Sequence, residues 1–328
     1  MKMAQMAEVN YEKLIGHLKA GAKLIEVRPL PGSFSNETML LRYETAVGPE
    51  QVVVRCYAVF GDYDRGEKAE REFRALALCQ KHHIPVPAPL LLDKSGELLG
   101  SPGIVTSFVA GQQLIQPTDE ATWVAELGQT LAKIHAIPLT KNDLRFMLDG
   151  NEEVVWSLRH EKTKEEMFTH PDGRITWQAV HDLLPTIQPV PPALMHIDYW
   201  LGNILWQEGR ITTVLDWEEA SYGDPGYDVA YLRLELAMLG GEPLANAFLA
   251  AYEAGYGRPV ANLAFWELAA AARFLPTPEG MIGEWQALQP GVYNETAVQQ
   301  NFRDILASAL KRAGITTEKK MNGEDPRI

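Results

Sequence analysis

The sequence has little of what marks several protein classes. Its 328 residues include only 2 cysteines, too few for a disulfide framework, which favours a reducing cytoplasm. No apolar run reaches the roughly 18 residues that a membrane-spanning helix needs, and the polar residues 1–10 lack the order of a secretory signal. Internal repeats and low-complexity tracts are also absent. We therefore expect a cytoplasmic globular protein with no membrane partner.

Basic residues are scarce relative to acidic ones. The chain holds 30 Lys and Arg against 43 Asp and Glu, which gives a net charge of −13. Residues 1–108 contain 13 of each kind, so the whole net charge belongs to the remaining 220 residues. This balance argues against a nucleic-acid partner, which requires a basic surface. It is compatible with attraction of a cationic small molecule, although a need for solubility explains it equally well.

The first part of the chain has the pattern of a small sheet. Glu8–Ala20 and Asp64–His82 have helical spacing, and turn residues separate short apolar runs that we expect to form an antiparallel sheet. These runs are Leu24–Leu30, Thr38–Tyr43, Gln51–Tyr57, Leu90–Leu92 and Gly103–Val109.

Helical spacing dominates from Thr118 onward. The predicted helices are Asp119–His135, shorter ones near Asn151–Met167 and Thr176–Leu184, and then Asp224–Leu239, Pro243–Tyr256, Ala261–Phe274 and Thr296–Ala313. The sequence thus predicts an α+β protein with a sheet domain at residues 1–109, a helical domain at 110–315 and a mobile tail at 316–328.

The segment His196–Asn203 reads H-x-D-x-x-x-x-N. This spacing is typical of a kinase catalytic loop, in which the Asp accepts the proton of the substrate hydroxyl and the Asn holds magnesium. We therefore predict that Asp198 is the catalytic acid–base group and that Asn203 is a metal ligand. The alternative is that both residues only form a turn, as Asp and Asn often do.

A second acid, Asp216, follows the alternating run Ile211–Leu215. Gln207–Gly209 predicts a hairpin turn that would bring Asp216 back beside Asn203. Oxygen ligands of this kind suit Mg²⁺, so we predict that Asn203 and Asp216 bind one magnesium ion. The alternative is an Asp that only caps the end of a strand.

The ordered motifs resemble the aminoglycoside phosphotransferase family, whose relatives include choline, fructosamine, homoserine and macrolide kinases. The matching segments are His196–Asn203, Val214–Glu218, Gly223–Ala230, Leu131–Pro138 and Arg71–Pro87. The resemblance implies a protein-kinase-like two-lobed fold with a small antiparallel N-lobe sheet and a mainly helical C-lobe. It also implies ATP as cofactor and a small-molecule hydroxyl as phosphate acceptor.

Several residues are candidates for nucleotide binding. Arg55 stands where a kinase has its phosphate-binding Lys, and Glu72 is its expected partner, with Glu70 a weaker candidate. An ordinary ion pair is the alternative. The loop before Asn36 lacks G-x-G-x-x-G, so it either caps phosphates through Ser35 and Asn36 or is a plain polar turn. By analogy, the connection that includes Ser107 and Val109 would contact adenine.

Other acids and aromatic residues of the second part are less specific. We expect structural roles for Asp224 and Asp228 at the start of a helix. Acid and aromatic groups can bind an ammonium group, although such residues more often belong to a core. The acids and aromatic residues concerned, with the basic Arg273 among them, are Trp200, Glu218, Glu219, Tyr222, Trp266, Glu267, Arg273, Glu279, Glu284 and Trp285.

Three functions fit the sequence. The leading one is ATP-dependent transfer of the γ-phosphate to a hydroxyl of a small molecule, for which the charge favours a cationic acceptor such as an aminoglycoside, amino alcohol or amino sugar. A non-catalytic nucleotide-binding scaffold of the same fold is the alternative. A protein kinase is disfavoured because Asp216 precedes Trp217 and Glu218 rather than Phe-Gly, and no A-P-E segment is present. The sequence predicts no oligomeric state.

Overall fold

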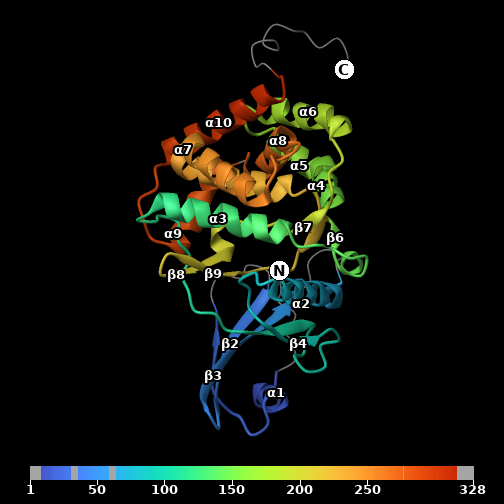
Figure 1. Ribbon diagram of the computed structural model, residues 1–328, viewed down its shortest axis with the longest axis vertical. Helices are drawn as coiled ribbons and strands as arrows, with labels where there is room; N and C mark the ends of the chain where they lie inside the picture. Colours follow the sequence, from blue (N-terminus) through green and yellow to red (C-terminus); the bar gives the residue numbers. More distant parts are fainter. Residues whose placement is uncertain (1–8, 31–35, 59–63, 276, 316–328) are drawn as a thin grey trace. The chain divides into compact units, whose positions relative to one another are not determined.

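The computed structural model describes residues 9–30, 36–58, 64–275 and 277–315, which form two compact units (Figure 1). Unit 1 comprises the described parts of Met1–Gln112, Leu139–Leu148 and Asn203–Ser221. Unit 2 comprises the described parts of Gln113–Pro138, Asp149–Gly202 and Tyr222–Ile328. Ser35, most of its predicted phosphate loop and the predicted tail 316–328 lie outside the described residues.

Unit 1 is built on a five-stranded antiparallel sheet with the order β1-β2-β3-β5-β4. Its strands are β1 (Lys23–Pro29), β2 (Asn36–Thr45), β3 (Gly48–Tyr57), β4 (Pro89–Asp93) and β5 (Gly103–Ser107). The helices are α1 (Tyr11–Leu18) and α2 (Arg65–Lys81), with the short 3₁₀ turn η1 (Asp143–Arg145). Asp64 caps α2, because its carboxylate accepts the Glu67 N–H at 2.9 Å.

The alternation of β3 explains where the core of unit 1 forms. Val52, Val54 and Cys56 are buried on one face and pack with Leu41 and with Leu14 of α1. Because successive strand residues point to opposite faces, Arg55 projects away from this core.

Both cysteines, Cys56 and Cys79, are buried free thiols. Burial raises the pKa of Cys56 to about 12. The two thiols are therefore packing groups rather than reactive ones.

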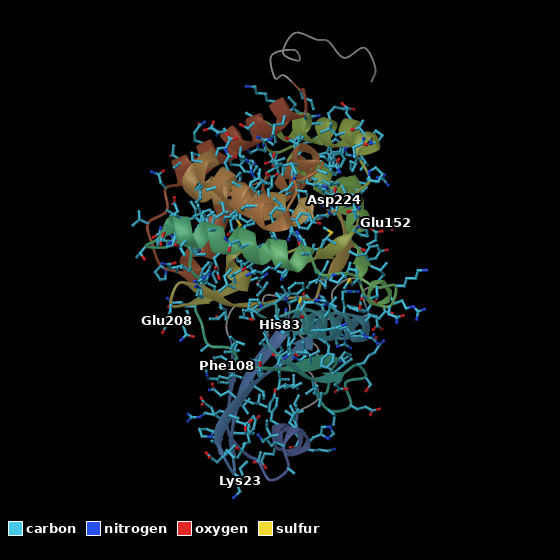
Figure 2. The ribbon with its side chains drawn as sticks, viewed as in Figure 1. Lys23, His83, Phe108, Glu152, Glu208 and Asp224 are labelled. Atoms are coloured by element: carbon cyan, nitrogen blue, oxygen red, sulfur yellow. The ribbon has the colours of Figure 1, made fainter. Side chains whose placement is uncertain are left out.

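A two-stranded hairpin, β8 (Ile204–Gln207) and β9 (Arg210–Val214), also belongs to unit 1. Glu208 lies at its turn (Figure 2), and Glu208 and Gly209 both have positive φ, 52° and 74°. Two positive φ values in succession fit a type I′ turn, which suits the twist of a two-residue hairpin. The predicted hairpin is therefore present.

Unit 2 is mainly helical. Its helices are α3 (Glu120–His135), α4 (Gly150–Arg159), α5 (Glu161–Met167), α6 (Gly173–Leu183), α7 (Gly226–Tyr256), α8 (Leu263–Phe274), α9 (Met281–Leu288) and α10 (Glu295–Arg312). Helices α3 and α7 lie side by side (Figure 1). Shorter pieces complete the chain: β6 (Leu148–Asp149), η2 (Leu184–Thr186), β7 (Ala193–Met195), η3 (Leu201–Asn203), β10 (Ser221–Gly223) and η4 (Pro278–Gly280).

The helices differ from the expected pattern at specific residues. The break expected between Leu239 and Pro243 is present, since Gly241 has φ 77° and ψ 179° inside α7. The single helix expected over Asn151–Met167 is wrong, because His160 is extended and separates α4 from α5. Among the described residues, no helix is both long and apolar enough to cross a membrane.

Candidate active site

The H-x-D loop is anchored by a buried carboxylate. The backbone N–H groups of His196 and Ile197 donate to the two carboxylate oxygens of Asp228, at 2.6 and 2.8 Å. Ile197 has φ 72°, a conformation that a β-branched residue adopts only when its surroundings impose it. The paired N–H groups supply that constraint, and the loop that carries Asp198 is fixed.

Asp228 is itself held from α3. His135 Nε2 lies 3.2 Å from Asp228 Oδ2, and His135 Nδ1 lies 2.8 Å from the Tyr252 hydroxyl. All three side chains are buried. These contacts confirm the structural role that we predict for Asp228, and they give His135 a place in the same network.

Asp224 also has a structural position. Its carboxylate accepts the Gly226 N–H at 2.9 Å and the Asn262 side-chain amide at 2.9 Å. Helix α7 begins at Gly226 with Pro225 as its N-cap, so Asp224 supports the helix start from one residue further out than a standard cap.

A second buried acid lies behind the same loop. Glu235 of α7 accepts the Leu201 N–H at 3.0 Å and the Trp285 indole N–H at 2.9 Å. Burial, with a smaller contribution from the charge of Asp198, raises the pKa of Glu235 to about 7. The two hydrogen bonds to Glu235 favour its charged form, whereas burial disfavours that form and has the larger effect.

Asp198, the predicted catalytic group, is partly exposed. Its side chain is 29% accessible, and its Oδ1 lies 3.6 Å from a guanidinium nitrogen of Arg273 on α8. No sequence pattern connects Arg273 with Asp198, because 75 positions along the chain separate them.

Asn203 and Asp216 come together in unit 1. Ile204 pairs with Val214 in the β8–β9 hairpin, and the Asn203 carbonyl accepts the Leu215 N–H at 2.8 Å. Asp216 follows directly with φ 65°, a left-handed conformation that turns it out of the strand. The hairpin expected from the turn at Gln207–Gly209 thus brings the Asn203 backbone beside Leu215, the residue that precedes Asp216.

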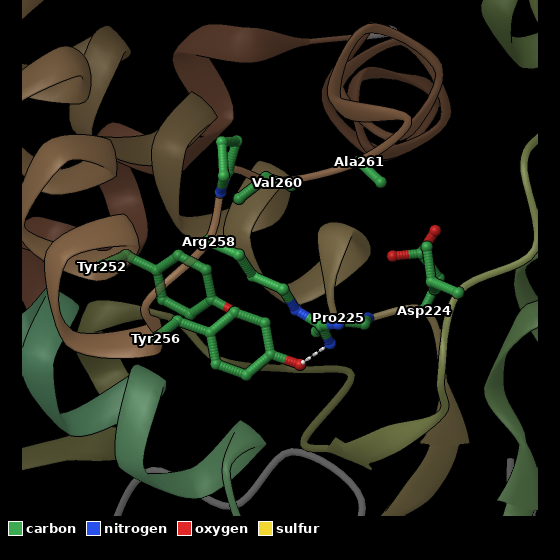
Figure 3. Close-up of a pocket in the computed structure, with 9 residues that line it drawn as sticks. Asp224, Pro225, Tyr252, Tyr256, Arg258, Val260 and Ala261 are labelled. Carbon is green, nitrogen blue, oxygen red and sulfur yellow. Dashed lines mark hydrogen bonds between the residues drawn. The ribbon is translucent and has the colours of Figure 1, made fainter.

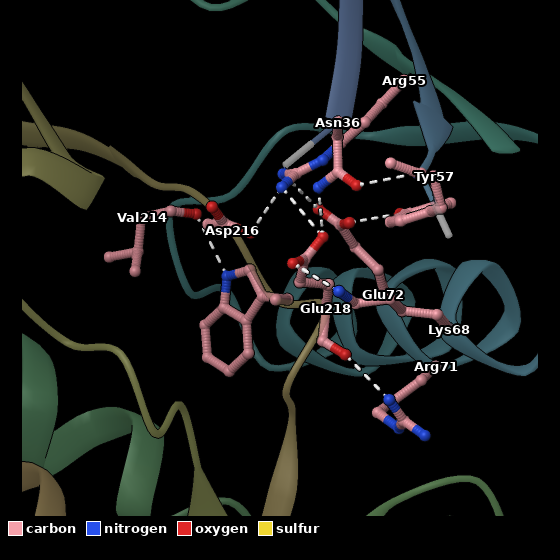
Figure 4. Close-up of polar contacts among 11 residues, drawn as sticks. Asn36, Arg55, Tyr57, Lys68, Arg71, Glu72, Val214, Asp216 and Glu218 are labelled. Atoms are coloured by element: carbon pink, nitrogen blue, oxygen red, sulfur yellow. Dashed lines mark hydrogen bonds and ion pairs between the residues drawn. The ribbon is translucent and has the colours of Figure 1, made fainter. Parts of the chain in front are cut away.

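Three carboxylates surround Arg55 (Figure 4). Its guanidinium nitrogens lie 2.7 Å from Asp216, 3.0 Å from Glu218 and 3.3 Å from Glu72. Burial opposes the charge of Arg55, but the carboxylates of Glu72 and Asp216 outweigh it and raise the Arg55 pKa. The expected Arg55–Glu72 contact is present and is one part of a larger cluster.

Sequence reasoning missed Glu218 and Lys68 as members of this cluster. Lys68 Nζ lies 2.7 Å from Glu218, and Arg71 donates to the Glu218 backbone carbonyl at 3.0 Å. The carboxylates of Glu72, Asp216 and Glu218 offer oxygens within 4.8 Å of one another. The signal available in the sequence was the position of Glu218 two residues after Asp216, within the segment Val214–Glu218.

Burial decides the charge of Glu72. Desolvation raises its pKa to about 7, although the charge of Arg55 acts in the opposite direction and Asp216 and Glu218 reinforce the rise. The Tyr57 hydroxyl also donates to the Glu72 carboxylate. Beside the two cations Arg55 and Lys68, the three acids offer carboxylate oxygens, which are the ligands that a hard divalent cation prefers.

The remaining nucleotide candidates have definite partners. The Asn36 amide donates to Glu218, and its carbonyl accepts the Ala58 N–H at 3.4 Å. The Ser107 hydroxyl accepts the Ala88 N–H at 2.9 Å, while Val109 lies beyond the end of β5 and is partly buried.

Glu70 contacts Arg74 and Lys94, at 2.7 and 2.6 Å. In the described structure its ion pairs are therefore with these two cations, whereas Glu72 pairs with Arg55.

Several acids and aromatic residues of the second part are core residues. Trp266 and Trp285 are 1% and 0% exposed. Glu267 is buried and pairs with Arg233 and Arg312. These groups are not available to bind a substrate amine.

A strand cation paired with a helix carboxylate and an H-x-D-x-x-x-x-N loop are features of the kinase class of phosphotransferases, and here the cation is Arg55. Comparison with protein families agrees, because the phosphotransferase enzyme family matches residues 26–267. The match covers most of the chain, and the chain belongs to this family.

Solved structures show the same fold. The macrolide 2′-phosphotransferase of Brachybacterium faecium superposes with a TM-score of 0.60 at 20% identity, over 97% of this chain and 99% of that chain. The choline kinase of Streptococcus pneumoniae gives 0.55 at 19% identity, over 93% and 97%. The predicted α+β, protein-kinase-like fold is therefore confirmed.

Among curated proteins, the mouse acyl-CoA dehydrogenase family member 10 is 27% identical over 194 residues. The match covers 55% of this chain but only 18% of that protein. The chain thus corresponds to a minor part of the length of such relatives.

Proposed function

We propose that this chain transfers the γ-phosphate of ATP to a hydroxyl group of a small molecule. The single observation that carries the proposal is the cluster of unit 1, in which Asp216, Glu218 and Glu72 gather around Arg55. Membership of the phosphotransferase enzyme family supports it. Solved structures of similar fold include ATP and ADP complexes of aminoglycoside phosphotransferases, which supports ATP as the donor.

The donor set of the cluster fits a hard divalent cation. Asp216 and Asn203 would hold magnesium, with the Glu218 carboxylate close enough to take part. When bound, magnesium neutralises charge on the phosphates and on the transferred group. Arg55 would then exchange carboxylate contacts for phosphate oxygens, which its planar fork accepts in the same geometry. Glu72 would keep Arg55 in position.

Asp198 would act on the acceptor. It orients the acceptor hydroxyl, and the acceptor oxygen forms a bond to the γ-phosphorus while the bond from that phosphorus to the bridging oxygen of ADP breaks. The hydroxyl proton passes to the Asp198 carboxylate. The contacts between Asp228 and the backbone of residues 196 and 197 would keep Asp198 in place during this step.

We also infer a division of labour along the chain. Residues 1–109, with the hairpin segment Asn203–Ser221, would bind the nucleotide, and the helical residues up to 315 would bind the acceptor. Ser35, Asn36, Ser107 and Val109 remain candidates for contacts with ATP. Val109 would contribute its backbone groups, because its side chain is apolar. The Ser107 hydroxyl already accepts the Ala88 N–H.

The test is Asp198→Asn, measured by ADP release in the presence of a panel of hydroxyl acceptors. Removal of a general base typically lowers turnover by about 10²–10⁴-fold, while calorimetric titration should show unchanged ATP binding. Asp182→Asn, at an exposed position of α6, is the matched control and should keep full turnover. Retained turnover in Asp198→Asn would overturn the role of Asp198.

Magnesium dependence gives a separate test of the cluster. Chelation by EDTA should stop ADP release. Asp216→Asn should raise the magnesium concentration needed for half-maximal turnover. A wild-type protein that binds ATP but releases no ADP with any acceptor or with water would favour the non-catalytic scaffold.

A further inference from the structure

Arg273 stands beside the proposed catalytic carboxylate in unit 2. It lies near the end of α8, its side chain is 45% exposed, and its guanidinium is 3.6 Å from Asp198 Oδ1. This separation is too long for a hydrogen bond, so the two charges attract each other without a direct N–H···O contact. The guanidinium is therefore able to donate to another oxygen while it remains next to Asp198.

Aromatic residues hold Arg273 in position. Its guanidinium carbon lies 4.7 Å from the centre of the Tyr231 ring, and the Tyr227 hydroxyl is hydrogen-bonded to it. Tyr231 in turn stacks on Phe274 at 5.3 Å. A cation fixed over an aromatic face loses little freedom when it binds a ligand, which makes Arg273 a prepared binding group rather than a mobile surface side chain.

The buried acids of unit 2 are already engaged. Glu267 pairs with two arginines, Asp228 holds the catalytic loop, and Glu235 accepts two N–H groups. These three buried carboxylates of the described part of unit 2 are therefore committed to contacts within the protein. The charged group that the structure places next to Asp198 is a cation.

We propose that Arg273 binds an oxyanion of the acceptor, so that the preferred acceptor is a hydroxyl compound bearing a carboxylate or phosphate group rather than an amine. The inference rests on the proposed function, since it takes Asp198 as the group that meets the acceptor hydroxyl. An arginine fork donates two parallel hydrogen bonds to either oxyanion. Arg273 is thus a specificity-determining residue, and an ammonium group at the same place is repelled.

Two matched series of compounds test this proposal. The first is glycerol, glycerate, glycerol phosphate and serinol; the second is glucose, glucuronate, glucose phosphate and glucosamine. Binding is measured by calorimetry without ATP, and turnover by ADP release with magnesium and ATP. In each series the oxyanion members should bind more tightly than the neutral member and the amine should bind most weakly. The carboxylate and phosphate arms show which oxyanion fits.

Three variants locate the effect. Arg273→Gln should weaken binding of the oxyanion members by roughly tenfold or more, the value of a charge-assisted hydrogen bond, with little change for the neutral members. Arg273→Lys keeps the charge but not the fork and should fall between.

The matched control is Arg258→Gln. Arg258 also stacks on a tyrosine, with its guanidinium carbon 4.7 Å from the Tyr256 ring centre, and it lines a small pocket of about 70 Å³ with Asp224 (Figure 3). This variant should retain the oxyanion preference. Thermal unfolding of all variants separates lost binding from lost folding.

The outcomes are distinguishable. Equal or weaker binding of the oxyanion members relative to the neutral ones overturns the inference, as does an Arg273→Gln variant that lowers turnover equally for every acceptor. Turnover with only neutral or amino acceptors would overturn the inference but leave the proposed function intact. Arg273-dependent oxyanion binding without ADP release would overturn the proposed function but leave the binding of an oxyanion by Arg273 intact.

Discussion

Asp228 accepts two backbone N–H groups and contacts His135 while it is fully buried. Replacement by Asn keeps the shape but substitutes an N–H donor for one acceptor oxygen, so at least one loop N–H loses its partner. We expect Asp228→Asn to lower the free energy of unfolding by about 1–3 kcal/mol, the cost of a buried unsatisfied donor. Urea unfolding measures this change.

The same variant should lower turnover as well, because the strained backbone at Ile197 would relax and move Asp198. Asp182→Asn is again the control and should change neither quantity. If Asp228→Asn were as stable and active as the parent protein, the anchoring role described here would be wrong.

At the scale of residues, the sequence predicts contacts that depend on local geometry. The hairpin turn brings Asn203 and Asp216 together, and the strand and helix positions of Arg55 and Glu72 lead to their ion pair. Contacts set by the tertiary fold were not predictable. Arg273 next to Asp198 is an example, because no spacing rule joins α8 to the loop.

Helices α3 and α7 pack closely at Gly128. A Cβ atom there would lie 2.7 Å from the Tyr252 nitrogen and 2.9 Å from the Phe248 carbonyl oxygen, both backbone atoms of α7. Gly128→Ala should therefore push the two helices apart and lower the free energy of unfolding by about 1–3 kcal/mol, in spite of the better helix propensity of Ala.

Gly283 in α9 provides the matched control, since nothing lies within 4 Å of its added Cβ. Gly283→Ala should stabilise the protein by up to about 1 kcal/mol. Chemical denaturation of both variants tests the contrast, which would fail if the two substitutions changed stability in the same direction.

At the scale of elements, periodicity predicted the strands of unit 1 and the long helices of unit 2. The break in α7 was also predictable, because Gly241 and Pro243 both disfavour a continuous helix. Helix α9 was missed, since Trp285 is its only buried residue and one anchor gives no periodic signal. The separation of α4 from α5 at His160 has no sequence marker such as Gly or Pro.

Glu235 should make the stability of the whole molecule depend on pH. Burial raises its pKa from 4.5 to about 7, so the folded state holds the proton more tightly than the unfolded state does. The resulting stabilisation is complete below about pH 4.5 and is lost as the pH rises through about 7. A shift of this size corresponds to a free energy on the order of 3 kcal/mol.

Glu235→Gln removes this titration. The difference in free energy of unfolding, variant minus parent, should be more positive at pH 8 than at pH 5. We expect this difference to change by roughly 3 kcal/mol between the two pH values. Urea unfolding at both pH values measures the difference.

Trp285→Phe offers an independent check, because loss of an indole donor that lowers the Glu235 pKa should move the transition to higher pH. A difference between Glu235→Gln and the parent that stays constant with pH would contradict the assignment.

The burial of both native thiols has a practical consequence for experiments on the complete chain. Because Cys56 and Cys79 are shielded, maleimide dyes should react selectively with cysteines introduced at exposed positions, for example Glu208 in unit 1 and Val292 in unit 2. Fluorescence energy transfer between such dyes would then follow the separation of the two units during nucleotide addition, against a background free of native labelling.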